Sequence, residues 1–545
     1  MKKSVLLAPA IGDIAVLLLF ASMLVSNTLH GDQVSAQLFN PVFVIVTGFY
    51  LSRLVILCRV NIIHSVITAL IQIWAIFEAA KGILQIIGLV HSNNSLFICT
   101  GSFDNPGPYG GFLAVCCSVS LFGLLDSRYR AGTSAINRLL AYVSILMCTI
   151  VLPSTQSRAA LMALMCSGAV FVFANAKVRS YMIKYWKLLL MLILVAFAVI
   201  FMFKRQSASG RLFINKMNLR TMVDNRMQGV GMGHFPNAYG NTQMTYFKKR
   251  IGFAQGELVY DRSDKERQTA DTPNAPFNEY LRIGIEFGLC SMVLFLSVCL
   301  FSLYHLYLKG SPLLYCMVSM SVFALFSYPF SQWQFLTLLV ICIAYSASEQ
   351  KTDRALLCRV GMPLVLSVIF ICLTIPKLGS MRECQKGKAD WEKQRFLYEG
   401  KQYGNYGYCC SQLYESQKYN YAFLYEYAYS LFMNGMYPES ESIAMQGLKL
   451  NCNPLFYCLL GDLYKAQGRL ADAEREYQNA FYLLPDRLYP LGRLATLYHE
   501  SGDSVRFRNM VMSIREFEPR VESASTQSIR RMVNEMAEQA HLVCE

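Results

Sequence analysis

Three charged residues, Glu279, Arg282 and Glu286, open an apolar run and are spaced by three and four residues. That spacing places them on one face of a helix. At a rise of 1.5 Å per residue, Glu286 would lie about 10 Å below the start of the helix. Charged groups at that depth in apolar surroundings are costly, so they indicate either a functional site or a buried pair. The alternative is an ion-pair ladder that only holds helices together.

Cations gather at two other places where they suit an anionic ligand. Arg158 follows a polar run at 154–157 and opens an apolar run of its own. Residues 204–275 contain twelve Lys and Arg against six Asp and Glu, and such a surface attracts anions. The alternative for Arg158 is an arginine that snorkels to a membrane surface. For most of the longer segment, the alternative is a solvated loop.

Glycines stand beside a histidine within that longer segment. Gly229, Gly231 and Gly233 precede His234, and glycines permit tight backbone approach. The run is not a dinucleotide-binding fingerprint, because it does not lie between a strand and a helix of a βαβ unit.

The stretch TGSFDNPGPYGGFLAVCC, which begins at Thr100, sets polar residues directly against an apolar run. Its prolines fix an extended turn, and its glycines allow close approach. Asp104 and Asn105 then either point into a ligand cavity or cap a helix that begins at Pro106.

The composition indicates that the lipid bilayer is the solvent for much of this chain. Of its 545 residues 54% are apolar and 16% are charged, and the mean hydropathy is +0.32. That is more apolar surface than one soluble core usually hides. The first apolar run follows Met-Lys-Lys without a convincing cleavage site, so we expect a retained helix rather than a signal peptide. We predict eleven spans, at 5–26, 40–58, 61–88, 107–125, 138–153, 158–175, 186–203, 277–304, 313–329, 331–347 and 356–375.

Basic residues lie in alternate short loops, as at Arg53, Arg128 and Lys309, which predicts a cytoplasmic N-terminus. The same order places residues 101–108, 153–157, 204–275 and the C-terminal region on the outer side. The net charge of +14 then needs no nucleic acid, because much of it faces the anionic inner leaflet. The cysteines outside the spans have no metal-ligand spacing, so we predict no metal site.

A repeat of 34 residues occupies the polar C-terminal region, where Gly461 aligns with Ala495 and Tyr464 with Tyr498. That period is the tetratricopeptide one, in which small residues lie where two antiparallel helices touch. We predict an all-α protein. Residues 1–376 form a polytopic membrane helical bundle that includes the outer segment 204–275, and residues 377–545 form a soluble tetratricopeptide α-solenoid. A generic helical bundle is the alternative for the C-terminal region.

Four stretches in this order resemble the O-antigen ligase superfamily of bacterial membrane glycosyltransferases, which includes O-antigen polymerases and protein O-oligosaccharyltransferases. GSFDNPGPYGGFLAV is similar to the family's Gly-x-Phe-x-Asn-Pro segment, and TQSRAAL to its Ser-Arg at a span mouth. GR followed by GVGMGHFPNAY is similar to its outer-loop Arg and Gly-x-Gly-x-x-Phe run, and FNEYLRIGIEFGL to its His-Asn-x-x-Leu segment.

The resemblance implies transfer of a glycan from a polyprenyl-pyrophosphate carrier to an acceptor hydroxyl, without metal, nucleotide or other cofactor. Negative charge then develops on the leaving group, and Arg forks stabilise such charge with paired hydrogen bonds. We assign Arg158 and Arg211 to the pyrophosphate and hold Arg226 in reserve with Arg220. The predicted substrate-binding residues are Arg158, Arg211, Arg220, Asn105, Asn278 and Arg282.

The acceptor oxygen needs a general base within hydrogen-bond reach. In the family that this chain resembles, the expected base is the His that precedes the Asn. Here Phe277 occupies that position before Asn278. Glu279, two residues further on, and His234 are the predicted catalytic residues in its place.

The predicted function is that of a glycan ligase or protein O-oligosaccharyltransferase in the bacterial inner membrane, with a periplasmic C-terminal domain. The acceptor is the core of lipid A or the Ser and Thr hydroxyls of a protein, and the repeats offer a surface to hold it. A polymerase, which joins one carrier-linked repeat unit to another, is the nearest alternative. A non-catalytic membrane scaffold or lipid-carrier transporter that recruits partners through its repeats is the alternative of another class.

Overall fold

The structure is a computed structural model that describes residues 11–29, 33–58, 60–130, 133–175, 178–180, 184, 205–348 and 356–540. The chain divides into two compact units. Unit 1 comprises Met1–Leu29, Phe39–Arg205 and Ala275–Lys377. Unit 2 comprises His30–Leu38, Gln206–Asn274 and Leu378–Glu545.

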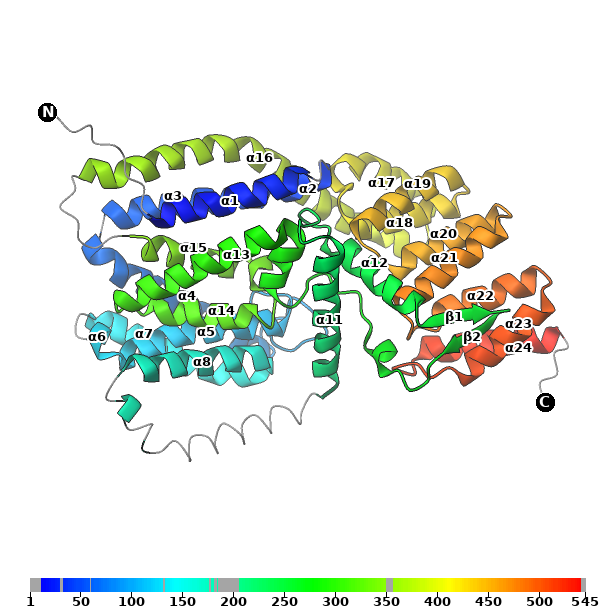
Figure 1. The fold of residues 1–545 in the computed structure, drawn as a ribbon, viewed down its shortest axis with the longest axis horizontal. Helices are drawn as coiled ribbons and strands as arrows, with labels where there is room; N and C mark the ends of the chain where they lie inside the picture. The colour runs from blue at the N-terminus through cyan, green and yellow to red at the C-terminus, as the bar shows by residue number, and fades with distance from the viewer. Residues whose placement is uncertain are drawn as a thin grey trace. The chain divides into compact units, whose positions relative to one another are not determined.

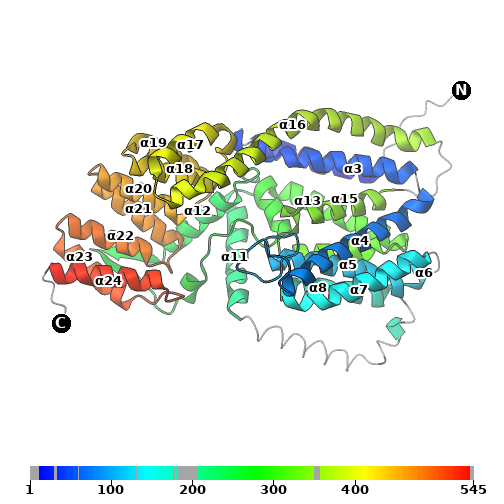
Figure 2. The ribbon, with the colours of Figure 1, turned by 180° about the vertical axis from the view of Figure 1, so that it is seen from behind.

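Unit 1 is a bundle of apolar helices, shown in Figure 1 and from behind in Figure 2. In the described part of the chain, seven helices are long and apolar enough to cross a membrane, and three more are apolar but shorter. These ten coincide with ten of the predicted spans, which confirms an all-α polytopic membrane protein. The predicted span 186–203 lies outside the described residues. The elements are α1 (Ile11–Leu29), α3 (Asn40–Cys58), α4 (Val60–Ile86), α5 (Pro106–Leu125), α6 (Ser127–Arg130), α7 (Ala135–Thr155), α8 (Arg158–Ala174), α13 (Glu279–Leu308), α14 (Leu313–Ala324), the 3-10 turn η2 (Pro329–Ser331), α15 (Trp333–Ser346) and the first part of α16 (Leu356–Glu399).

Helix α14 is shorter than its predicted span, 313–329, because it ends at Ala324. Most of its residues are buried, and it packs against α5, α8 and α13. An apolar helix that is covered by other helices does not have to match the thickness of the hydrocarbon layer. Hydropathy alone does not separate such a core helix from a lipid-facing span.

Helix α5 is the centre of unit 1, and small residues bring its neighbours close. A Cβ atom on Gly110 would lie 2.4 Å from the hydroxyl of Thr155, and one on Gly111 would lie 2.2 Å from the ring of Phe323. Polar side chains join α5, α8 and α14 deeper down, where the hydroxyl of Ser319 lies 2.6 Å from that of Ser118 and 2.7 Å from that of Ser167. Small and hydroxyl residues at helix contacts are typical of membrane bundles.

Helix α13 is broken within its length. Gly288 has φ +85° and ψ 169°, which is not helical. Glycine adopts such a φ without steric cost. The break separates a first segment, which carries Glu279, Arg282 and Glu286, from the longer apolar segment that follows. Interrupted helices at membrane depth commonly line a cavity or a binding site.

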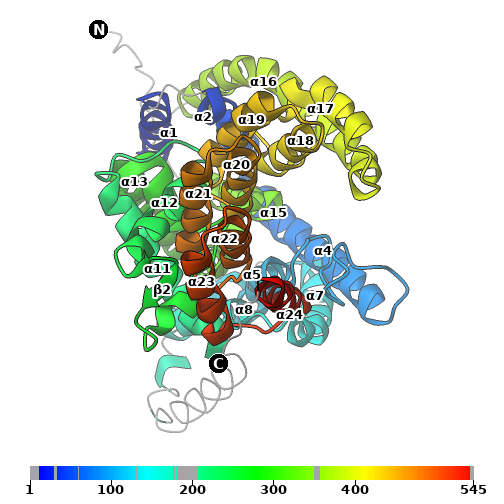
Figure 3. The same ribbon diagram turned by 90° about the vertical axis from the view of Figure 1, so that its right-hand side faces the viewer.

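Unit 2 is predominantly helical in its described residues and contains a small hairpin. Figure 3 shows its C-terminal helices following one another from yellow to red. The strands β1 (Ile251–Ala254) and β2 (Glu257–Tyr260) pair antiparallel, with Ile251 opposite Tyr260. The remaining elements are α2 (Gln33–Leu38), α11 (Arg205–Asp224), α12 (Phe235–Lys248), the 3-10 turn η1 (Lys265–Thr269), the end of α16, α17 (Tyr403–Gln417), α18 (Tyr421–Met433), α19 (Tyr437–Leu450), α20 (Pro454–Ala466), α21 (Leu470–Leu483), α22 (Tyr489–Glu500), α23 (Ser504–Glu516) and α24 (Ala524–Gln539).

The C-terminal helices form successive pairs, α18 with α19, α20 with α21 and α22 with α23. A glycine follows the first helix of each pair, and Gly435, Gly468 and Gly502 all have φ near +75°. Within one pair, a Cβ atom on Gly461 would lie 2.3 Å from the ring of Tyr477, so glycine permits the close helix contact. These features follow the 34-residue period, and the assignment to the tetratricopeptide family stays a prediction.

The predicted outer segment 204–275 folds onto the C-terminal helices. Helix α12 packs against α21, and the Gln243 amide donates a hydrogen bond to the Leu483 carbonyl at 2.7 Å. The Arg267 guanidinium donates to the carbonyls of Pro485 and Glu518 at 2.9 and 2.8 Å. Much of this segment is therefore ordered by distant parts of the chain.

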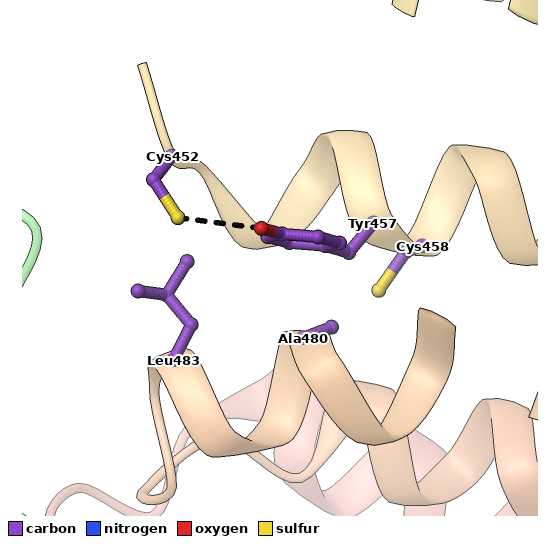
Figure 4. Close-up of a cluster of buried hydrophobic side chains, with 5 residues drawn as sticks. All are labelled: Cys452, Tyr457, Cys458, Ala480 and Leu483. Carbon is purple, nitrogen blue, oxygen red and sulfur yellow. Dashed lines mark hydrogen bonds between the residues drawn. The ribbon is translucent and has the colours of Figure 1, made fainter. Parts of the chain in front are cut away.

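A buried cluster joins α20 and α21 beneath α12. Figure 4 shows Cys452, Tyr457 and Cys458 above Ala480 and Leu483, with the Cys452 thiol 3.5 Å from the Tyr457 hydroxyl. Met244 of α12 packs against this cluster. Apolar burial of this kind holds α12 in place.

Candidate active site

Helices α5, α8, α13 and α15 begin at one end of unit 1, where α4, α7 and α14 end. We call this end the mouth. The Ser157 hydroxyl donates to the Gly107 carbonyl at 3.3 Å, which joins the starts of α8 and α5. The Tyr280 hydroxyl donates to the Ser321 carbonyl at 3.1 Å, which joins the start of α13 to α14. Five predicted site residues stand at these helix starts: Asn105, Arg158, Asn278, Glu279 and Arg282.

Asn105 caps α5. Its backbone is extended, and its side-chain oxygen accepts a hydrogen bond from the Gly107 N–H at 2.8 Å. Pro106 follows at the first helical position, as an N-cap favours. The prediction that this stretch caps the helix at Pro106 is therefore correct for the side-chain oxygen of Asn105. The amide nitrogen has no hydrogen-bond partner in the described part of the chain, so a contact with substrate stays a prediction.

Asn105→Ala is expected to lower the free energy of unfolding by about 1 kcal/mol, because the α5 N-cap is lost. Asn105→Ser keeps an N-cap oxygen and is expected to stay within a few tenths of a kcal/mol of the wild type. Thermal unfolding in detergent measures both. Equal stability of the two variants would contradict the capping role, and a lower transfer rate with Ser would support a substrate contact by the amide.

Arg158 is the first residue of α8. Ser157 caps this helix, and its hydroxyl accepts a hydrogen bond from the Ala160 N–H at 3.4 Å. The Arg158 side chain is half-buried and has no hydrogen bond or ion pair with any residue that the structure describes. A helix N-terminus directs N–H groups and positive dipole charge outward. The guanidinium and the helix end together suit an anionic group.

Glu279, Arg282 and Glu286 form a ladder on one face of α13, as their spacing predicts. The Arg282 guanidinium lies 3.3 Å from a Glu286 carboxylate oxygen and 3.6 Å from a Glu279 oxygen. Both glutamates are nearly fully buried. Two carboxylates share one cation, so the ladder has a formal excess of one negative charge when both are ionised.

The turn η2 covers this ladder. The Phe330 N–H donates to Glu279 at 2.9 Å, and Arg282 donates to the Ser331 hydroxyl at 2.7 Å. Asn278 is the N-cap of α13, and its oxygen accepts from the N–H groups of Tyr280 and Leu281 at 3.1 and 3.2 Å. Arg282 and Asn278 are thus tied into the protein at the mouth.

The other predicted residues, Arg211, Arg220 and His234, belong to unit 2. Arg211 and Arg220 are exposed on α11, and the Arg220 guanidinium lies 4.5 Å from the centre of the Tyr246 ring. His234 immediately precedes α12, and its Nδ1 lies 3.3 Å from the Lys449 carbonyl.

A polar cavity of about 500 Å³ lies beside His234. Most of its lining side chains are amides, hydroxyls and one carboxylate. The lining residues are Asp224, Asn225, Val230, His234, Asn237, Ala238, Asn241, Thr242 and Thr245.

The glycines before His234 serve a contact within the protein. Gly231 and Gly233 have φ of +86° and +84°. Added Cβ atoms would lie 2.4 Å from the Ser35 hydroxyl and 2.2 Å from the Leu38 side chain. The predicted close approach is therefore made by α2.

Residues 141–296, from α7 into α13, match the family model described as O-Antigen ligase. The match covers 156 of the 545 residues, so this part of the chain is similar to the O-antigen ligase family. Members act as glycosyltransferase-like ligases or polymerases, which implies a lipid-linked glycan donor and an acceptor. The apolar helices and this family fit a bacterial inner-membrane protein. No curated protein matches the chain.

The matched O-antigen ligase segment contains Arg158, His234 and Glu279, whereas Asn105 precedes it. Sequence reasoning missed a set of residues outside it, on α4. Gln85 accepts hydrogen bonds from the N–H groups of Thr100 and Gly101 at 2.9 and 2.8 Å and donates to the Gly101 carbonyl at 3.1 Å.

Two further residues of α4 hold the same loop. Glu78, which is buried, accepts from the Ser102 N–H at 3.0 Å, and Lys81 donates to the Ser102 hydroxyl at 3.2 Å. The spacing of Glu78, Lys81 and Gln85, three and four residues inside an apolar span, is the same signal that marked the α13 ladder. We call these three residues the α4 brace.

Gln85→Leu is expected to destabilise the protein by about 2 kcal/mol or more, because buried N–H groups of Thr100 and Gly101 lose their acceptor. Amide hydrogen exchange of residues 99–105 is expected to accelerate. Gln72→Leu on the same helix is the matched control, since its buried side-chain oxygen has no hydrogen-bond partner in the described structure. Similar exchange in the two variants would contradict the bracing role.

Proposed function

We propose that this protein transfers a glycan from a polyprenyl-pyrophosphate carrier to an acceptor hydroxyl at the mouth of unit 1. The observation that carries the proposal is Arg158, a half-buried cation without a described partner at the N-terminus of α8. A pyrophosphate supplies the missing negative charge. Fixed cations and N–H groups also stabilise the charge that develops as the bond from sugar to pyrophosphate breaks.

Glu279 is proposed as the general base. It is the first residue of α13, and Glu286 lies closer than Glu279 to the Arg282 that they share. The ladder has one more negative charge than Arg282 can neutralise, and this excess favours uptake of a proton by the Glu279 carboxylate. The acceptor oxygen attacks the anomeric carbon, its proton passes to Glu279, and polyprenyl pyrophosphate departs.

Unit 2 supplies the other proposed groups. Arg211 and Arg220 are proposed to bind the pyrophosphate from α11, on a segment with excess positive charge. His234 is the second candidate for the base, supported by the polar cavity of about 500 Å³ that it lines. Such a cavity of amides and hydroxyls suits a hydroxyl-bearing acceptor.

A glycan ligase or protein O-oligosaccharyltransferase is proposed ahead of a polymerase, because the paired C-terminal helices provide a large surface that can hold a lipid or protein acceptor. We place these helices, as tetratricopeptide repeats, in the periplasm of a bacterium. A scaffold or lipid-carrier transporter is the alternative of another class, and a scaffold makes no use of a cation at Arg158.

The purified protein in detergent, given a polyprenyl-pyrophosphate glycan without added metal or nucleotide, tests these proposals. The acceptors are a lipid A core, a protein extract, or the carrier-linked glycan alone. Product on the lipid or the protein supports ligation and names the acceptor, and product with the carrier-linked glycan alone supports a polymerase. No product from folded protein on any acceptor supports the scaffold or transporter.

A further inference from the structure

A band of tyrosines runs across the C-terminal helices of unit 2. Ring centres lie 5.8 Å apart for Tyr398 and Tyr403, 5.5 Å for Tyr403 and Tyr429, and 6.3 Å for Tyr425 and Tyr429. Tyr489 is linked to α20 through Arg493, which donates a hydrogen bond to the Tyr489 hydroxyl at 2.7 Å and pairs with Asp462 at 3.2 Å. All five rings are partly exposed. We call Tyr398, Tyr403, Tyr425, Tyr429 and Tyr489 the tyrosine face.

The rings come from successive helices that touch. Tyr398 is on α16, Tyr425 and Tyr429 are on α18, and Tyr489 opens α22, with α20 in contact with both α18 and α22. These elements follow one another in Figure 3. The face therefore extends along several helix pairs and can contact an extended ligand.

One ion pair stands beside the rings. Asp462 of α20 accepts a hydrogen bond from the Tyr477 hydroxyl at 2.6 Å and forms an ion pair with Arg493 at 3.2 Å. Arg493 also donates to the Tyr489 hydroxyl at 3.0 and 2.7 Å. The Arg493 side chain is 36% exposed. Burial raises the pKa of the Tyr429 phenol, and Arg493 acts on it in the opposite direction.

The chemistry of this face suits sugar rings. Asp462 and Arg493 cancel each other in charge, so the pair has no net attraction for a polyanion. Aromatic rings offer flat apolar area on which the C–H faces of a pyranose can stack, and a few oriented polar groups bind its hydroxyls. An extended peptide takes much of its affinity from main-chain hydrogen bonds, which tyrosine rings do not supply.

We propose that the tyrosine face binds the glycan of the carrier-linked donor through stacked pyranose rings. This inference rests on the proposed function, in which a glycan is part of every donor whichever acceptor is used. Binding of the part of the donor that does not react adds affinity away from the bond that breaks. The tyrosine face then selects donors by their glycan.

The test uses the full-length protein in detergent and the oligosaccharides released by mild acid from the polyprenyl carrier of the cells in which the protein naturally occurs. Fluorescence anisotropy of the labelled oligosaccharides gives Kd. Tyr489 is replaced because it is 39% exposed, more than the other four rings of the tyrosine face. Tyr489→Ala is expected to weaken binding roughly tenfold, through the loss of one stacked ring. Tyr489→Phe keeps the ring and is expected to stay within about twofold.

Tyr408→Ala is the matched control, because Tyr408 is 70% exposed on α17 and is not part of the tyrosine face. Its binding is expected to equal that of the wild type. Absence of binding by the wild type, or equal binding by Tyr489→Ala, would overturn the inference. A third result would also overturn it: Tyr489→Ala loses binding to a labelled Ser/Thr-rich peptide, while its binding to the oligosaccharides is unchanged.

Failure of the inference and failure of the proposed function give different results. Transfer activity without oligosaccharide binding at the tyrosine face overturns only the inference. Binding that depends on Tyr489, in a protein without transfer activity, overturns only the proposed function.

Discussion

Arg158→Ala is expected to lower kcat/KM for glycan transfer by about 10²–10³-fold, the usual effect of removing one group that stabilises developing negative charge. Arg158 is half-buried at the start of α8, and no described residue is paired with it. Its removal therefore breaks no internal ion pair, and the amount of folded protein should stay normal. Transfer in detergent, normalised to folded protein by size-exclusion chromatography, measures the effect.

Two further substitutions test whether the effect depends on the shape of the Arg158 side chain and whether it is specific to that position. Arg158→Lys keeps the positive charge but loses the planar fork, so partial activity is expected. Arg138→Ala on α7 removes another arginine, an exposed one, and should leave transfer unchanged. Transfer at the wild-type rate in Arg158→Ala would assign the arginine to a surface role and remove the main support of the proposed function.

Glu279→Gln is expected to lower kcat by about 10²–10⁴-fold with little change in KM, because general-base catalysis contributes that much. The glutamine side chain still accepts a hydrogen bond from the Phe330 N–H, which Glu279 accepts at 2.9 Å. It cannot take up the proton of the acceptor. Steady-state kinetics with saturating donor checks the division between kcat and KM.

Glu286→Gln is the matched control for Glu279→Gln, because it changes the other carboxylate beside Arg282. It is expected to alter stability more than transfer. Equal losses of activity in the two variants would make the ladder a purely structural brace. A loss in His234→Asn with full activity in Glu279→Gln would move the base to unit 2.

Much of unit 1 was predictable, because the length of an apolar run is set by the membrane that it must cross. The predicted span 107–125 is α5 (Pro106–Leu125), and the predicted span 158–175 is α8 (Arg158–Ala174). Helix α14 shows the limit, since its packing inside the bundle and not its hydropathy determines where it ends. The kink at Gly288 has no sequence signal beyond a glycine within an apolar run.

Contacts between distant segments explain what sequence reasoning missed. Gln243 and Leu483 are 240 positions apart, and their hydrogen bond helps to turn a predicted outer loop into a packed part of unit 2. Gly231 and Gly233 were correctly associated with close approach, but the approaching element is α2. The α13 ladder was predicted because its spacing is local. The same spacing marks the α4 brace, whose role depends on a loop that the sequence does not place.

The identity of the lipid product tests the central claim most directly. Purified wild-type protein is given a polyprenyl-pyrophosphate glycan and an acceptor, and mass spectrometry identifies the lipid that is released. The account predicts polyprenyl pyrophosphate in equal amount to the transferred glycan, because the bond from sugar to pyrophosphate breaks. Polyprenyl monophosphate, with phosphate remaining on the glycan, would contradict it, as would transfer of glycan without release of either lipid.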